Sequence, residues 1–150
     1  MAKAFGIVNF AGNHIRVEGM QEYRPVGAFS FLGRYRVIDF PISNMSNSGI
    51  DHIQVYIRRN PQSLTAHLGT GRHYNINSKS GNLQILYSGL GMNMSLYNND
   101  IASYIENLEY IEQELAEYVV IAPSYMVYTQ DYKKLLNEDR KSTRLNSSHY

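Results

Sequence analysis

Apolar and polar positions alternate along the chain in blocks that are typical of successive strands. A short apolar run at 3–9 leads into a segment rich in glycine, asparagine and histidine, as expected for a buried first strand and the loop after it. Residues 52–57 are rich in β-forming side chains and predict a second strand. Residues 83–87 predict a third, and the continuous apolar run 118–122 predicts a strand that is buried on both faces.

Helix signals fall between these strands. Asp39 precedes a helix of about ten residues, with Pro41 in its first turn and Gly49 just beyond its end. Asn60 is the expected cap of a second helix, whose first position is Pro61. Strand and helix therefore alternate through the first half of the chain.

A third helix is predicted after Asn99 or Asp100, either of which could cap it. Its apolar residues recur every three or four positions, which predicts that they pack into the core: Ile101, Tyr104, Ile105, Leu108, Ile111 and Leu115. Thr129 is the expected cap of a last helix. Residues 69–99 are rich in glycine, asparagine and serine and are predicted to be mainly surface loop, apart from the third strand.

The order βαβαβαβα predicts an α/β fold with a largely parallel sheet and helices on both of its faces. Ligands of such folds bind beyond the carboxyl ends of the strands. The loops that matter most for function are therefore 10–24 and 123–128. No internal repeat or domain boundary interrupts residues 1–138.

Composition narrows the class of protein further. The chain has 150 residues, of which 43% are apolar, enough to form one core and so one soluble domain or part of one. It has no apolar run long enough to span a membrane and no amino-terminal signal sequence. The absence of cysteine excludes disulfides, thiolate zinc sites and a cysteine nucleophile. A cytoplasmic location is expected.

The end of the chain differs in character from the rest. The formal net charge is +1, and +2 of it comes from four residues near the end: Asp139, Arg140, Lys141 and Arg144. The nearly neutral remainder gives no electrostatic reason to expect a nucleic-acid or anionic-membrane partner. The sequence DRKSTRLNSSH at 139–149 lacks apolar periodicity and resembles a translated sequencing-adapter oligonucleotide. Residues 139–150 are therefore expected to be a disordered artefact, with a natural polar terminus as the alternative.

The segment GRYRVIDFPISNMSNSGI at 33–50 is similar to the signature G-G-K-Y-R-I-I-D-F-x-L-S-N-x-x-N-S-G-I of glucose-1-phosphate adenylyltransferases. SLTAHLGTGRHYN from residue 63 and YVVIAPSYMVYTQDY from residue 118 fit further segments of that family at comparable spacing. The resemblance implies a Rossmann-like nucleotidyltransferase domain with three layers. Because family members are more than twice as long and finish in a β-helical domain, it also implies that this domain is incomplete at the C-terminus.

Enzymes of this family join glucose 1-phosphate to the AMP part of ATP with Mg²⁺, using a glycine-rich loop that approaches the triphosphate. The resemblance places that loop, A-G-G-x-G-T-R-L, on residues 10–17. Gly12 and Arg16 are retained and Asn13 stands at the variable position, but Ala11 and His14 replace glycines that allow close backbone approach. The loop is therefore expected to be vestigial, and it fits an ordinary strand-to-loop turn equally well.

The other catalytic motifs of the family are also altered. The family lysine, which neutralises the leaving pyrophosphate, corresponds to Val26, although Arg24 is retained. The aspartate that holds the metal corresponds to Tyr125, and a phenol is a poor Mg²⁺ ligand. The nucleotide-approaching motif W-Y-x-G-T-A-D-A is replaced by LYNNDIAS at 96–103. No catalytic residue and no metal ligand is therefore assigned.

Two pairs of arginines each have two possible roles. Arg34 and Arg36 could hold a phosphate, or could have structural or subunit-contact roles within the signature. Arg58 and Arg59 could receive a phosphorylated effector, or could form a solvated pair at a strand end. Asp39 is interpreted as a helix cap. Four histidines sit at no recognisable metal-ligand spacing: His14, His52, His67 and His73.

An intact scaffold signature beside altered chemistry motifs resembles GlgD-type chains of the family, which pair with a catalytic adenylyltransferase subunit in glycogen synthesis. The resemblance implies a catalytically deficient regulatory subunit in a hetero-oligomer, with no cofactor of its own. One alternative is an active adenylyltransferase that uses Mg²⁺ with substitutes such as Arg16, Arg24 and Asp100. Another is a non-catalytic sensor of a sugar-phosphate or nucleotide effector, and a third is a stand-alone structural protein.

Overall fold

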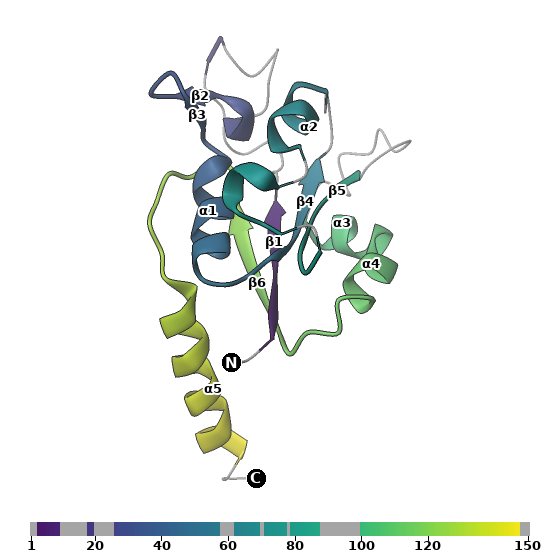
Figure 1. Ribbon diagram of the computed structural model, residues 1–150. Helices are drawn as coiled ribbons and strands as arrows, with labels where there is room; N and C mark the ends of the chain where they lie inside the picture. The colour runs from purple at the N-terminus through teal and green to yellow at the C-terminus, as the bar shows by residue number, and fades with distance from the viewer. Residues whose placement is uncertain are drawn as a thin grey trace.

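The fold is built on a parallel sheet of four strands. The computed structural model describes residues 3–9, 18–19, 26–57, 62–69, 71–77, 79–87 and 100–147 of the chain (Figure 1). The strands are β1 (Ala4–Asn9), β4 (His52–Ile57), β5 (Asn82–Tyr87) and β6 (Tyr118–Pro123), in the order β5-β4-β1-β6. All three pairings are parallel, which confirms the predicted α/β class and all four predicted strands to within a residue or two at their ends.

Helices lie on both faces of the sheet. They are α1 (Asp39–Asn47), α2 (Gln62–Leu68), α3 (Asp100–Glu106), α4 (Leu108–Glu112) and α5 (Tyr132–Ser147), with 3-10 turns at η1 (Val26–Ala28) and η2 (Arg72–Tyr74). A small antiparallel hairpin, β2 (Ser30–Phe31) and β3 (Tyr35–Arg36), precedes α1. Its two-residue strands are too short to show periodicity, so the sequence did not predict it. None of the described helices is long and apolar enough to cross a membrane.

The larger core lies between the sheet and the helices α1, α2 and α5. Ile42 and Met45 of α1 and Leu64 of α2 are fully buried against the alternate residues of the strands that point to this face, such as Val55. Gly6 of β1 allows this close approach, because a Cβ at that position would meet the sulfur of Met45 and the methionine side chain would have to shift. The close contact brings α1 directly onto the central strand.

The opposite face carries a smaller core beneath α3 and α4. Phe5, Ile7, Tyr56 and Leu86 form it, with Tyr104 packed against them. This cover does not extend over β6, where the two side chains on this face, Val119 and Ile121, are exposed. The prediction that 118–122 is buried on both faces is therefore wrong, because β6 lies at the edge of the described sheet with helices on one side only.

The predicted helix over 101–115 is two helices in the structure, separated at Asn107. The Asn107 amide donates hydrogen bonds to the carbonyls of Ser103, at 3.0 Å, and Tyr87, at 3.3 Å. Of the predicted core stripe, Tyr104 and Ile111 pack against the smaller core. The burial predicted for the other four is wrong, since their side chains are exposed: Ile101, Ile105, Leu108 and Leu115.

Two other expectations about local structure are corrected. Residues 71–77 are not simply surface loop, because η2 places Tyr74 among the buried residues of the larger core, where Ile76 joins it. At the last helix, Asp131 rather than Thr129 provides the capping oxygen, which accepts a 3.0 Å hydrogen bond from the amide of Lys133.

The polar end of the chain continues a helix. Helix α5 extends to Ser147, so the expected disorder of 139–150 is wrong for residues 139–147. The proposed adapter origin of this segment stays a prediction. Asn60, Pro61 and Asn99, the other expected helix-start residues, lie outside the described residues.

Candidate functional site

The sheet reverses its strand order between β1 and β6. The chain adds β4 and then β5 on one side of β1, and it later adds β6 on the other side. In open parallel sheets, ligands bind beyond the carboxyl ends of the strands at this reversal. The last residues of the two strands, Asn9 and Pro123, are aligned with each other, and the amide of Ser124 donates a 2.8 Å hydrogen bond to the carbonyl of Asn9. The segments after β1 and β6 therefore start side by side.

Asn9 closes the end of β1 through its side chain. It is buried, and its amide donates a hydrogen bond to the hydroxyl of Tyr104 in α3. The Tyr104 ring contacts the Tyr56 ring edge-on, at 5.6 Å between centroids. The sequence analysis missed this pair, although a polar residue at the end of an otherwise apolar strand was a signal that could have found Asn9.

A chain of polar side-chain contacts continues from Tyr56 along β4, beneath α4. The Tyr56 hydroxyl donates to the Gln54 side-chain oxygen at 2.9 Å, and the Gln54 amide donates to Glu114 at 3.3 Å. Glu114 lies 3.2 Å from a ring nitrogen of His52, at the amino end of the strand. Burial raises the pKa of the Tyr56 hydroxyl above its ordinary value, and Tyr104 and Glu114 raise it further. These contacts fix α3 and α4 onto the sheet.

Tyr125 occupies the turn directly after β6. Its neighbour Ser124 is fully buried, and its amide is hydrogen-bonded to the end of β1. Tyr125 itself is half-buried, at the position where the family resemblance expects an aspartate. Mg²⁺ is bound in proteins mainly by carboxylates and water. The side chains of Asn9 and Tyr125, an amide and a phenol, are not of the kind that this ion prefers. Within the described ranges, no group of three or more His, Asp or Glu side chains is arranged to hold a metal.

Val26 begins η1 and is half-buried. Its carbonyl accepts a 3.0 Å hydrogen bond from the amide of Phe29, and the next carbonyl, of Gly27, accepts one of 2.9 Å from Ile38 at the start of α1. The turn is thus attached to the signature segment. An isopropyl side chain at this position provides no charge for a phosphate.

Asp39 is a buried hydrogen-bond acceptor that joins several elements, which we call the Asp39 junction, rather than a helix cap. The cap position of α1 is Ile38, without a side-chain hydrogen bond. One oxygen of the Asp39 carboxylate accepts hydrogen bonds from His67, at 2.7 Å, and Tyr74, at 2.6 Å. The other accepts the backbone N–H of Arg36, at 2.8 Å. The cap interpretation is therefore wrong, and Asp39 instead joins β3, α1, α2 and η2.

The contact with Asp39 also changes the pKa of Tyr74. Burial raises the pKa of its hydroxyl, the hydrogen bond to Asp39 raises it further, and Arg36 acts in the opposite direction.

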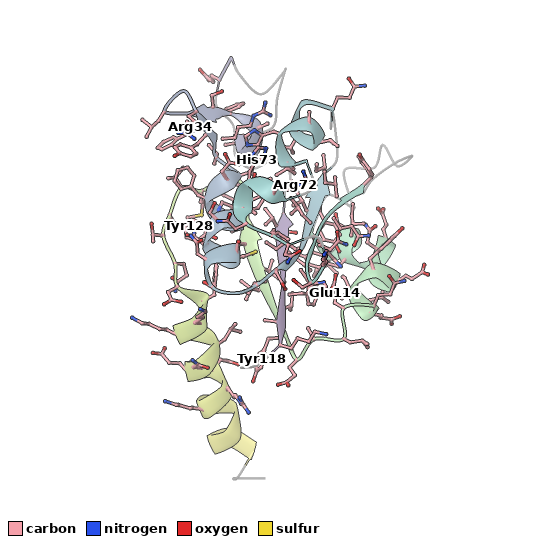
Figure 2. The ribbon with its side chains drawn as sticks, viewed as in Figure 1. Arg34, Arg72, His73, Glu114, Tyr118 and Tyr128 are labelled. Atoms are coloured by element: carbon pink, nitrogen blue, oxygen red, sulfur yellow. The ribbon has the colours of Figure 1, made fainter. Side chains whose placement is uncertain are left out.

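Arg34 is exposed, with its guanidinium 5.9 Å from the centre of the Tyr35 ring. Figure 2 shows Arg34, Arg72 and His73 at the end of the molecule toward which the arrows of β1 and β4 point.

The structure thus brings Tyr125 to the end of β1 and places Arg34 and Arg36 on the hairpin. The remaining candidate residues lie outside the described residues: Ala11, Gly12, Asn13, His14, Arg16, Arg24, Arg58 and Arg59. The roles predicted for them from the sequence stay predictions.

A parallel sheet with this strand order and a ligand edge between its first and last strands defines a Rossmann-like α/β nucleotide-binding domain. Residues 6–147 match the Nucleotidyl transferase family, and the chain belongs to that family.

Its relatives include glucose-1-phosphate adenylyltransferases. That of Fervidobacterium nodosum is 30% identical over 137 residues, covering 91% of this chain and 33% of the relative. That of Bacillus subtilis is 34% identical over 128 residues, covering 84% and 33%. That of Lachnospira eligens is 38% identical over 112 residues, covering 73% and 26%. The chain spans about a third or less of the length of these curated relatives.

Proposed function

We propose that this chain is part of a GlgD-type subunit of glucose-1-phosphate adenylyltransferase, which acts in the cytoplasm in glycogen synthesis. It modulates a catalytic partner subunit and contributes little catalysis itself. The observation that carries the proposal is that Tyr125 stands directly after β6, in the turn whose preceding residue, Ser124, is hydrogen-bonded to the end of β1.

The chemistry of adenylyl transfer explains why this position matters. Negative charge develops on the leaving pyrophosphate, and fixed cations and metal ions at that point lower the barrier. Removing one such stabilising group typically costs about a hundredfold to a thousandfold in rate. Val26 and Tyr125 would each remove one, so the two losses together are severe.

The retained parts support a role in assembly. Asp39 and its three hydrogen bonds hold the signature segment in a defined shape. A chain that retains this scaffold while altering its ligand edge is suited to pair with a catalytic homologue.

The first test is an assay of ADP-glucose pyrophosphorolysis by the purified complete protein without a partner. We expect negligible turnover. Turnover within about tenfold of a catalytic family member, a difference of roughly 1.4 kcal/mol in barrier, would refute catalytic deficiency. It would favour the active adenylyltransferase, with Mg²⁺ held by groups such as Asp100.

The second test is co-expression with a catalytic subunit. We expect a stable complex whose kinetics differ from those of the partner alone. The double variant Val26→Lys and Tyr125→Asp should recover little activity, because Ala11 and His14 remain in the loop and components of one site act as a unit. It should still form the complex.

Two independent species in size-exclusion chromatography, with the partner's kinetics unchanged, would contradict the regulatory-subunit proposal. A sensor of a sugar-phosphate or nucleotide effector would then be the better explanation. The exposed cations Arg34 and Arg72, at the end of the molecule toward which the arrows of β1 and β4 point (Figure 2), favour that second candidate.

A further inference from the structure

One side chain of α3 contacts the carboxyl ends of two neighbouring strands. Asn9, the last residue of β1, is aligned with Tyr56 of β4, and both contact Tyr104 of α3. The Asn9 amide donates a hydrogen bond to the Tyr104 hydroxyl, and the Tyr56 ring packs edge-on against the Tyr104 ring. Tyr104 is therefore held both by its hydroxyl and by its ring.

The polar part of this contact replaces what could have been an apolar one. Phe5 and Ile7 precede Asn9 at alternate positions of β1, and both belong to the smaller core. Asn9 continues that row with an amide and is only 7% exposed. A buried amide costs free energy unless it is hydrogen-bonded, and that bond is directional. The amide therefore favours one position of Tyr104, which an apolar side chain would not do.

The position of Tyr104 determines where α3 begins. Asp100, the first residue of α3, lies about one helical turn before Tyr104. Tyr104 packs on the smaller core, whereas Ile101 and Ile105 are exposed in the described chain. A shift of Tyr104 would therefore move the start of α3 relative to the end of β1.

We propose that Asn9 and Tyr104 are positioning residues for a nucleotide sugar that binds at the ligand edge of the sheet. Their hydrogen bond holds the start of α3 in one position relative to the end of β1, and neither side chain has to touch the ligand. Ligands of such sheets bind where the strand order reverses, and β1 is one of the two strands there. A ligand that contacts both segments binds more tightly when they are ordered beforehand. The inference rests on the proposed function for the class of ligand alone.

The test is isothermal titration of ADP-glucose into the complete protein, without a partner subunit. Tyr104→Phe removes only the hydroxyl, and Asn9→Leu/Tyr104→Phe replaces both partners by apolar side chains of similar shape. We expect each of these variants to bind ADP-glucose about tenfold more weakly than the wild type.

Tyr56→Phe is the matched control. It removes a hydroxyl from the same core but keeps the ring that contacts Tyr104. The lost hydroxyl donates to Gln54, at 2.9 Å, and takes no part in the bond between Asn9 and Tyr104. We expect this variant to unfold at a lower urea concentration than the wild type and to bind ADP-glucose equally well.

The double variant separates positioning from a purely structural role. Tyr104→Phe alone leaves the buried Asn9 amide without this acceptor, so it should unfold at a lower urea concentration than the wild type. Replacing both partners should restore the midpoint, because two apolar side chains need no hydrogen bond. The affinity for ADP-glucose should nevertheless stay low. A double variant that regains affinity together with stability would overturn the proposal, as would equal losses of affinity in Tyr56→Phe and Tyr104→Phe.

Amide hydrogen exchange gives a second measurement that needs no ligand. We expect faster exchange over 100–106 in Tyr104→Phe and in the double variant, and unchanged exchange in Tyr56→Phe. Unchanged exchange in the first two would overturn the proposal, and so would a wild type that does not bind ADP-glucose at about 1 mM. Tighter binding by Tyr104→Phe with weak binding by the double variant would also overturn it, because Asn9 would then contact the ligand itself. Turnover by the wild type would refute the proposed catalytic deficiency and would leave these outcomes unaffected.

Discussion

Replacing Asp39 by alanine should be among the most destabilising single changes in the chain. The substitution leaves three donors without their acceptor: the backbone N–H of Arg36, the His67 ring and the Tyr74 hydroxyl. The three losses are unequal. Tyr74 is 6% exposed and cannot recover a water molecule easily, whereas the His67 side chain is 24% exposed and can.

The expected magnitude follows from those exposures. An orphaned buried donor costs about 1–3 kcal/mol, and a hydrogen bond to a charged group contributes about 1.5–3 kcal/mol. Asp39→Ala should therefore lower the free energy of unfolding by about 3–5 kcal/mol. That is a large part of the roughly 5–15 kcal/mol that holds a typical domain together.

Urea unfolding followed by circular dichroism measures this loss, together with Tyr74→Phe and the double variant. If the Asp39–Tyr74 hydrogen bond carries about 1.5–3 kcal/mol, the double variant should lose less than the sum of the singles by roughly that amount. Asp131→Ala, which removes an exposed helix cap, is the matched control and should cost about 0.5–1 kcal/mol. Additivity of Asp39→Ala and Tyr74→Phe within about 0.5 kcal/mol would show that the buried junction does not act as described.

Further predictions concern packing, pH and the end of the chain. Gly6→Ala should lower the free energy of unfolding in urea by about 1–3 kcal/mol, because the new Cβ meets the Met45 sulfur. The loss should be smaller when Met45 is also replaced by alanine. Equal losses with and without Met45 would contradict the contact. Burial raises the pKa of the hydroxyls of Tyr56, Tyr74 and Tyr132, so the folded state retains protons that the unfolded state loses above the ordinary value of 10.0. The free energy of unfolding should therefore be unaffected by these groups below that pH and fall as pH rises beyond it, with a shallower fall in Tyr132→Phe; an unchanged slope would count against this account. The coding DNA after the codon for Glu138 should match an adapter oligonucleotide, unless an intact genome encodes 139–149 followed by a natural stop codon.

The strands could be predicted because their signal is local. Residues 52–57 coincide with β4, and 118–122 differ from β6 by a single residue, since runs of β-branched and aromatic side chains disfavour helix on their own. The burial of those runs could not be predicted in the same way. Exposure of Val119 depends on which helices cover that face of the sheet, and nothing within the strand records that.

The two loops that matter most could be named from the sequence, but not the contacts around them. Strand alternation selected the loops after β1 and β6, and the Ser124 to Asn9 hydrogen bond joins the ends of those two strands in the structure. The junction at Asp39 depends on residues 28 and 35 positions further along the chain, His67 and Tyr74. No short-range pattern distinguishes such an aspartate from a helix cap, because both precede or begin a helix.

The central place of β1 has a consequence for synthesis of the chain. Ala4 is aligned with Tyr118 and Asn9 with Pro123, so β1 is synthesised more than a hundred residues before β6, its second neighbour in the sheet. Until then one row of its backbone N–H and C=O groups has no partner from β6 and remains a template for pairing with other chains. Such distant parallel pairing slows folding and prolongs that exposure. A nascent chain halted before residue 118 should therefore be held by chaperones or aggregate, even though α1, α2, α3 and α4 have already been made.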